Sequence, residues 1–193
     1  MNWEDGMKTY TIIGGVNGVG KSSLTGVLAG KNDDLGVIID TDKLNAEYGG
    51  DRIKGGKKAI ELMDTCLKKG LSFTQETTLS GVRTLKTIRR AIDLDYRVRL
   101  YYVGVSSCQE SLIRIENRVR KGGHDIPAED VKRRFEKRFD DLIAVLPYCS
   151  DAEFWDNENG FVKVGEYRNG TLTVYDGIAP QWMKELKISM ENV

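Results

Sequence analysis

Short apolar runs alternate along this chain with longer segments in which apolar residues recur every three or four positions. Alternation of this kind predicts buried strands separated by amphipathic helices. Because each run is followed by a helical pattern, we expect an α/β fold of three layers, with a parallel sheet of about five strands between helices. The runs predicted to be strands are Thr11–Gly14, Val37–Asp40, Leu71–Glu76, Tyr96–Val105 and Ala152–Trp155.

The same pattern predicts which positions are buried. The continuous apolar run Val37–Ile39 is typical of a strand that is covered on both faces. A helix after Lys21 is expected to turn Leu24, Val27 and Leu28 inward, and the helix over residues 82–92 is expected to bury Val82 and Ile92 at its ends. A long helix is expected to begin at Pro127 and to continue to Leu146.

Two further apolar runs near the C-terminus predict a β-hairpin. They cover Phe161–Tyr167 and Thr171–Tyr175, and the Asn169-Gly170 pair between them favours a tight turn. A last helix is expected from Pro180. The chain shows no internal repeat or linker, so residues 1–193 are predicted to form one domain, with the hairpin and last helix at about residues 160–190.

Residues 15–22 match the phosphate-loop pattern G-x-x-x-x-G-K-[ST], and they lie between the first predicted strand and the first predicted helix. The glycines let several main-chain N–H groups approach one phosphate, and the helix N-terminus adds a partial positive charge. Lys21 is expected to act on the β- and γ-phosphates of ATP or GTP, and Ser22 to bind Mg²⁺. The predicted nucleotide-binding residues are Gly15, Asn17, Gly18, Val19, Gly20, Lys21, Ser22 and Ser23.

Acidic and hydroxyl side chains follow the second and third predicted strands. Parallel strands bind ligands at their carboxyl ends, so Asp40, Asp42 and Glu76 are candidates for chemistry by position. Asp42 is the candidate base that takes a proton from an acceptor hydroxyl, although an acid after a strand is often only a helix cap. Asp40, Glu76, Thr77 and Thr78 are the predicted substrate-binding residues, and Glu76 could instead reach Mg²⁺ through water.

Arginines flank a glycine pair in the segment from about 107 to 135. Arg114 and Arg118 precede Gly122-Gly123, and Arg133 and Arg134 follow it. This arrangement predicts a helical lid that brings guanidinium groups to the γ-phosphate, although arginine-rich helices are often only solvated faces. Of these arginines, Arg118 and Arg134 are taken as the catalytic candidates. His124 beside the glycines is interpreted as a surface residue.

Composition narrows the class of protein. The 193 residues carry a formal net charge of zero, which makes nucleic acid an unlikely partner. No apolar run is long enough to span a membrane, and residues 1–6 are acidic, so we expect a cytoplasmic protein. Cys66, Cys108 and Cys149 fit no metal spacing and are expected to be buried free thiols.

Four stretches together resemble the zeta-toxin-like family of phosphate-loop kinases. They are residues 15–22, residues 40–42, the E-T-T-L-S-G stretch 76–81, and the R-V-R-K-G-G-H-D-I-P stretch 118–127 followed by Arg134-Phe135. The resemblance covers about residues 8–157 and is greatest for the chromosomal branch of that family, which comprises predicted ATPases and zeta-toxin family proteins.

The resemblance implies a kinase-type parallel sheet and a phosphotransferase that uses ATP or GTP with Mg²⁺. Characterised toxins of the family phosphorylate UDP-N-acetylglucosamine, so this sugar nucleotide is the implied first acceptor to try. By the same resemblance Asp42 is the catalytic base and Glu76 helps to hold the sugar nucleotide. An antitoxin-like protein is an implied partner.

The sequence therefore predicts a cytoplasmic kinase that moves the γ-phosphoryl group of ATP or GTP to a hydroxyl of a small molecule. Another class stays open, in which the protein is a nucleotide-binding switch or weak ATPase that acts through a protein partner. A polynucleotide kinase is a third reading, which the zero net charge disfavours.

Overall fold

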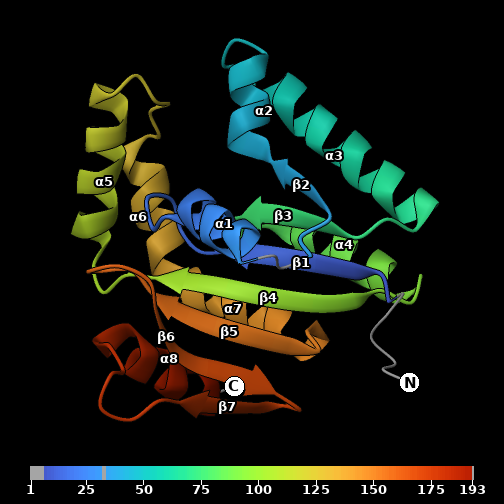
Figure 1. Ribbon diagram of the computed structural model, residues 1–193. Coiled ribbons are helices and arrows are strands. Elements are labelled where there is room, and N and C mark those ends of the chain that lie inside the picture. The colour runs from blue at the N-terminus through green and yellow to red at the C-terminus, as the bar shows by residue number, and fades with distance from the viewer. Residues whose placement is uncertain (1–6, 32–33, 193) are drawn as a thin grey trace.

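The computed structural model describes residues 7–31 and 34–192 (Figure 1). The acidic residues 1–6 lie outside this range. The strands are β1 (Thr9–Gly14), β2 (Val37–Asp40), β3 (Phe73–Thr77), β4 (Arg97–Gly104), β5 (Asp151–Asp156), β6 (Val162–Arg168) and β7 (Thr171–Val174). The helices are α1 (Lys21–Gly30), α2 (Thr41–Glu47), α3 (Arg52–Lys69), α4 (Val82–Ile92), α5 (Cys108–Arg120), α6 (Ala128–Glu136), α7 (Arg138–Val145) and α8 (Gln181–Glu191), with a 3₁₀ turn at Leu146–Tyr148.

Within the described residues, seven strands form one sheet in the order β2-β3-β1-β4-β5-β6-β7. The first five are parallel, which confirms the expected core of the sheet. The predicted hairpin is also confirmed, and it extends the same sheet as two antiparallel strands. Asn169 and Gly170 both have positive φ, as a tight hairpin turn requires.

Most of the apolar core lies on one face of the sheet, the face that points away from the viewer in Figure 1. Residues of α3, α4, α7 and α8 pack there against the even-numbered side chains of β1 and β4. The other face has a smaller core under α1, in which Ile13, Leu24 and Tyr101 take part. Helix α1 thus forms the third layer over the centre of the sheet.

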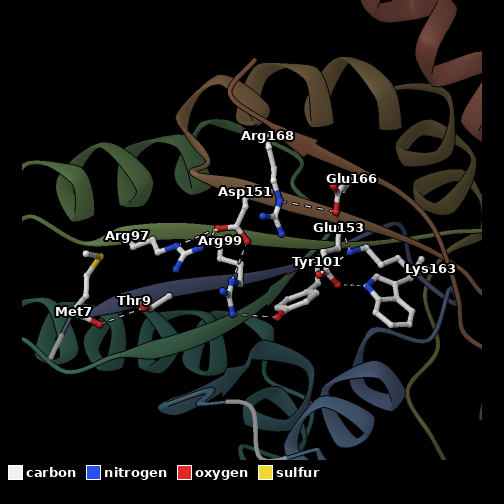
Figure 2. A network of polar contacts seen from close by, with 11 residues as sticks. Met7, Thr9, Arg97, Arg99, Tyr101, Asp151, Glu153, Lys163, Glu166 and Arg168 are labelled. Atoms are coloured by element: carbon white, nitrogen blue, oxygen red, sulfur yellow. Dashed lines mark hydrogen bonds and ion pairs between the residues drawn. The ribbon is translucent and has the colours of Figure 1, made fainter. Parts of the chain in front are cut away.

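Beside α1, the same face of β4, β5 and β6 carries charged side chains (Figure 2). Asp151 is buried and accepts hydrogen bonds from Arg97 and Arg99 at 2.7–3.1 Å. Lys163 donates to Glu153 on β5 and to Glu166 on its own strand, β6. Ion pairs therefore occupy the part of this face that lies next to the apolar core.

The expectation that β2 is covered on both faces is wrong. Val37 and Ile38 are 39% and 42% exposed, whereas Ile39 and Asp40 are buried. The cause is topological, because β2 is the edge strand and pairs with β3 alone among the described strands. Helices α2 and α3 extend from this edge (Figure 1).

The long helix expected from Pro127 is broken at Lys137, whose ψ of 4° leaves the helical region. Phe135 packs into the core under α1, and Phe139 packs into the main core on the opposite face of the sheet. Two residues four apart on a straight helix would face the same side, so the break lets each ring reach its own core. Pro127 caps α6 and is not its first residue.

Three apolar positions expected to be buried are exposed: Val27, Val82 and Ile92. In α4 the buried stripe runs through Thr84, Thr87, Ile88 and Ala91, so threonines take positions that the apolar pattern did not mark. The cysteines are free, with Cys66 and Cys149 buried and Cys108 partly exposed. Among the described helices, none has the length and apolar character that crossing a membrane would require.

Candidate active site

The phosphate loop joins β1 to α1 and packs tightly against three other segments. Gly15 has a φ of 141°, and a Cβ there would lie 2.4 Å from the carbonyl oxygen of Val103. Gly18 has a φ of 82° and would clash in the same way with the carbonyl oxygen of Ser111 on α5. Both positions therefore need glycine, for the backbone angle and for the close approach.

The side chain of Lys21 folds back over this loop. Its Nζ donates to the carbonyl oxygens of Gly15 and Val16, each at 3.0 Å. Burial lowers the pKa of Lys21, against the opposing attraction of Asp42, Glu76 and Asp40. The ammonium is thus held at the mouth of the loop, within a set of carboxylates.

Ser22 faces two carboxylates at the carboxyl ends of β2 and β3. Its Oγ donates to Glu76 Oε2 at 2.6 Å and lies 3.4 Å from Asp40 Oδ2, while Thr25 donates to Glu76 Oε1 at 2.7 Å. Burial raises the pKa of Glu76 even though both hydroxyls favour its ionised form. The fold thus holds a partly desolvated carboxylate directly against the phosphate loop.

This group of hydroxyl and carboxylate oxygens fits Mg²⁺. The ion prefers oxygen ligands and is usually bound by one or two carboxylates together with substrate phosphates. Ser22, Asp40 and Glu76 supply such a set. Among the described residues, no group of three or more His, Cys, Asp or Glu side chains that could hold a metal ion occurs.

Asp40 and Asp42 have different surroundings. Asp40 is buried, and its Oδ1 caps α2 by accepting from the amides of Asp42 and Lys43. The side chain of Asp42 is 57% exposed, and its Oδ2 lies 4.0 Å from Arg118. The capping role that the sequence left open thus belongs to Asp40, and Asp42 presents its carboxylate to the cleft.

Helices α5 and α6 make up the segment that was predicted to be a lid, and they have a small core of their own around Ile115, Ile126 and Val131. Residues 121–127, which we call the strap, connect the two helices. Arg118 donates to the carbonyl oxygen of His124 in the strap, and Arg134 donates to Asn17 of the phosphate loop at 2.6 Å. Both of these arginines therefore reach the cleft.

The other two arginines pair with carboxylates of their own helices, and Arg114 also lines the cleft beside the phosphate loop. Arg114 pairs with Glu110 on its own helix and donates to the carbonyl oxygen of Asn157 after β5. Arg133 pairs with Asp130 on the exposed side of α6. Arg114 fixes the loop that also binds the main chain of Val19 through the Asn157 amide.

The cleft consists of two adjoining cavities. The smaller, about 180 Å³, is lined by the phosphate loop, including Gly18, Gly20, Ser22 and Ser23. The larger, about 330 Å³, lies between α2, the start of α3, the loop after β3 and the strap. The residues that line both cavities are Asn17, Lys21, Asp42, Glu76 and Arg118.

Most predicted site residues are therefore brought together. Thr77, Thr78 and Arg134 line the larger cavity. Two of the nucleotide-binding candidates have no side chain that faces the cleft. Gly15 has only its backbone, and the side chain of Val19 is fully buried in the core.

Several side chains of the larger cavity were not predicted as site residues, among them Asn45, Arg52 and Asp125. Asn45 comes from α2, Arg52 from α3 and Asp125 from the strap. Asn45 lies three residues after Asp42, so the helical repeat could have placed it on the same face. The sequence carried no comparable signal for Arg52 or Asp125, which meet only in the folded chain, where Arg52 donates to the carbonyl oxygen of Asp125 at 3.1 Å.

Comparison with known sequences places the chain in a family. No protein-family model matches it. It is 32% identical over 126 residues to an uncharacterised protein of Haemophilus influenzae, a match that spans 63% of this chain and 88% of the relative. The chain belongs to the same family as this Haemophilus protein. The relative's description names no activity.

Solved structures with the same fold include one chain from a toxin-antitoxin system and one from a complex of two proteins. The PezAT chromosomal toxin-antitoxin system of Streptococcus pneumoniae matches 97% of this chain and 86% of its own, with a TM-score of 0.65 and 18% identity. The AvrRxo1-ORF1:-ORF2 complex with ATP matches 94% of this chain, with a TM-score of 0.68 and 14% identity, and this chain spans 64% of that one. The chain therefore shares the fold of these two proteins.

Proposed function

We propose that the protein is a Mg²⁺-dependent kinase that transfers the γ-phosphoryl group of ATP or GTP to a hydroxyl of a small molecule. One observation carries the proposal. Glu76, which accepts from Ser22 of the phosphate loop, and the Asp42 carboxylate beside Arg118 lie on the wall shared by two adjoining cavities. A nucleotide on one side and an acceptor on the other would meet at this wall.

The chain's own groups can perform the steps that phosphoryl transfer requires. Main-chain amides of residues 15–22 and the ammonium of Lys21 would bind the polyphosphate. Ser22, Glu76 and Asp40 would hold Mg²⁺, which when bound offsets negative charge on the phosphates. Asp42, exposed to the cleft, would accept the proton of the attacking hydroxyl.

The lid would supply positive charge and exclude water. Arg134 already bonds to Asn17 of the phosphate loop, and Arg118 faces Asp42. Guanidinium groups at these places can stabilise charge on the phosphoryl group in transit, and the strap covers the cavity next to them. An enzyme that excludes water in this way favours transfer to an acceptor over hydrolysis.

The acceptor and the partner are finer parts of the proposal. The resemblance to zeta-toxin-like kinases makes UDP-N-acetylglucosamine an acceptor to include in any screen. Because one structural neighbour belongs to a toxin-antitoxin system and the other is a two-component complex, we also propose an antitoxin-like protein partner.

The test is turnover of ATP and of GTP with Mg²⁺ and a panel of hydroxyl compounds, read as phosphorylated product. The kinase proposal predicts acceptor-dependent product that disappears in Lys21→Ala. Slow hydrolysis that no acceptor stimulates, with a protein captured or released upon nucleotide exchange, would favour the nucleotide-binding switch instead.

A further inference from the structure

The larger cavity is lined almost entirely by polar and charged residues, which limits what can bind there. Small-molecule sites are usually lined mostly by apolar and aromatic side chains, over volumes of about 300–1,000 Å³. This cavity, about 330 Å³, is at the lower end of that range. Ile126 is the one apolar residue among the described residues that line it, and no Phe, Tyr or Trp does so.

Such a lining is a poor match for a nucleobase or an apolar compound. Proteins hold nucleobases largely by stacking on aromatic rings, worth about 1–3 kcal/mol for each base. The described walls of this cavity offer instead amides, hydroxyls, carboxylates and guanidinium groups, which pair with a ligand through hydrogen bonds. A ligand that fits must therefore carry many hydroxyls for its size.

The charges of the walls balance. The cations are Lys21, Arg52, Arg118 and Arg134, and the anions are Asp40, Asp42, Glu76 and Asp125. Apart from the groups proposed above for the nucleotide and Mg²⁺, the charged residues are Arg52, Asp42 and Asp125, which also give no surplus of cations. A phosphorylated acceptor would need a surplus of cations here, because an anion removed from water requires pairing. The balance favours an acceptor without net charge.

We propose that the acceptor is a neutral, sugar-sized polyhydroxyl compound, an inference that rests on the kinase function proposed above. Of a sugar nucleotide, the sugar would occupy the cavity and the nucleoside diphosphate would lie outside it. The free sugar or polyol should therefore be at least as good an acceptor as its nucleotide-linked form.

The structure assigns recognition of an acceptor hydroxyl to Asn45. It is 8% exposed and lines the cavity, while its Oδ1 is enclosed where α2 crosses α3 at Gly55 and has no hydrogen-bond partner among the described residues. The close crossing of α2 and α3 at Gly55 fixes this side chain. The amide Nδ2 is then the group that can donate to a ligand hydroxyl in the cavity, and a ligand with that hydroxyl gains affinity over an analogue that lacks it.

The first experiment compares acceptors at equal concentration with ATP and Mg²⁺: neutral aldoses, alditols and cyclitols, sugar phosphates, nucleosides, and UDP-N-acetylglucosamine beside free N-acetylglucosamine. We expect at least one neutral polyol to raise ATP turnover tenfold or more over the acceptor-free rate, with nucleosides and sugar phosphates near that rate. If UDP-N-acetylglucosamine, a nucleoside or a sugar phosphate has the highest kcat/KM, the acceptor class is wrong and the kinase function stands.

Failure of the kinase function would look different, since no compound in the panel would then be phosphorylated or ATP would give no thermal shift.

The second experiment uses the best polyol with Asn45→Ala and, as a matched control, Lys57→Ala on the exposed side of α3. Loss of one hydrogen bond predicts a KM for the polyol raised about tenfold, with kcat and the KM for ATP unchanged. An unchanged polyol KM in a variant of normal melting temperature would overturn the role of Asn45.

Discussion

The two ends of the cleft differ in the groups that line them, main-chain groups at one end and side chains at the other. The phosphate end is one continuous segment in which main-chain groups face the ligand, packed so tightly that Gly15 and Gly18 leave no room for a Cβ. The acceptor end is made of side chains from α2, α3, the loop after β3 and the strap. The first depends on local backbone geometry, and the second depends on how distant segments meet.

This difference separates what is general from what is specific. A main-chain cradle binds any polyphosphate, so it can serve many phosphate-loop proteins unchanged. Side chains such as Asn45 and Arg52 can be exchanged one at a time without disturbing it. Variants at the two ends should therefore fail in different ways, and the predictions below test this in decreasing order of effect.

The largest effect is expected for Lys21→Ala. Removing the ammonium takes away the positive charge nearest the transferred phosphoryl group, which should lower turnover about 10³-fold. The thermal shift caused by ATP should shrink as well, which differential scanning fluorimetry measures. Turnover within threefold of the parent protein would show that Lys21 has no catalytic part.

A loss of about 10²-fold is expected for Asp42→Asn, since an amide cannot accept the proton of the acceptor hydroxyl. Steady-state rates should fall through kcat, whereas the dissociation constant for ATP, measured by calorimetry, should stay the same. Glu47→Gln on the exposed side of α2 is the matched control. If Asp42→Asn weakens ATP binding and leaves kcat unchanged, Asp42 belongs to the phosphate end of the cleft and does not act on the acceptor hydroxyl.

Glu76→Gln should separate function from stability. Apparent affinity for Mg²⁺ in the turnover assay should fall about 10–100-fold, because a carboxylate oxygen is lost from the proposed metal set. The folded protein raises the pKa of Glu76, so the ionised carboxylate opposes folding at neutral pH, and that penalty fades as the pH falls through the raised pKa.

The amide avoids the penalty, so the melting temperature without ligand should rise by about 2–4 °C at pH 7. The gain should shrink toward acidic pH. Melting curves measured between pH 4 and 8 provide the test. A gain that grows as the pH falls would mean that the carboxylate stabilises the fold.

The smallest effect on nucleotide binding is expected for Gly55→Ala. A Cβ at this position would lie 2.1 Å from Asn45 Oδ1, so α2 must move, and overpacking of this kind costs about 1–3 kcal/mol. The KM for the acceptor should rise and the KM for ATP should not. Gly56→Ala is the matched control, since a Cβ there meets no atom within 4 Å and alanine favours the helix.

The sequence predicted the phosphate end far better than the acceptor end. Residues 15–22 form a local motif, and Glu76 follows a strand, so both could be placed before any tertiary contact was known. Arg52 meets Asp125 across 73 positions of the chain, and no local pattern marks such a pair. The arginines of the lid could be named as a group, but only packing shows that Arg118 and Arg134 reach the cleft while Arg133 does not.

The fold predictions failed where a local pattern met a tertiary choice. A continuous apolar run looks the same in a central strand and in an edge strand, so the sequence could not place β2. The break at Lys137 was hidden because Phe135 and Phe139 keep helical spacing, although each packs into a different core. In both cases the sheet order supplied the missing information.

The position of β2 at the rim has an evolutionary consequence. Among the described strands β2 pairs with β3 alone, and α2 and α3 follow it directly. Replacing residues 37–71 by the equivalent stretch of a relative would therefore interrupt one row of strand pairing, provided that the two aspartates and the core residues of α3 are kept. A phosphate-loop protein arranged in this way can change the acceptor end of its cleft within one segment at the edge of the sheet.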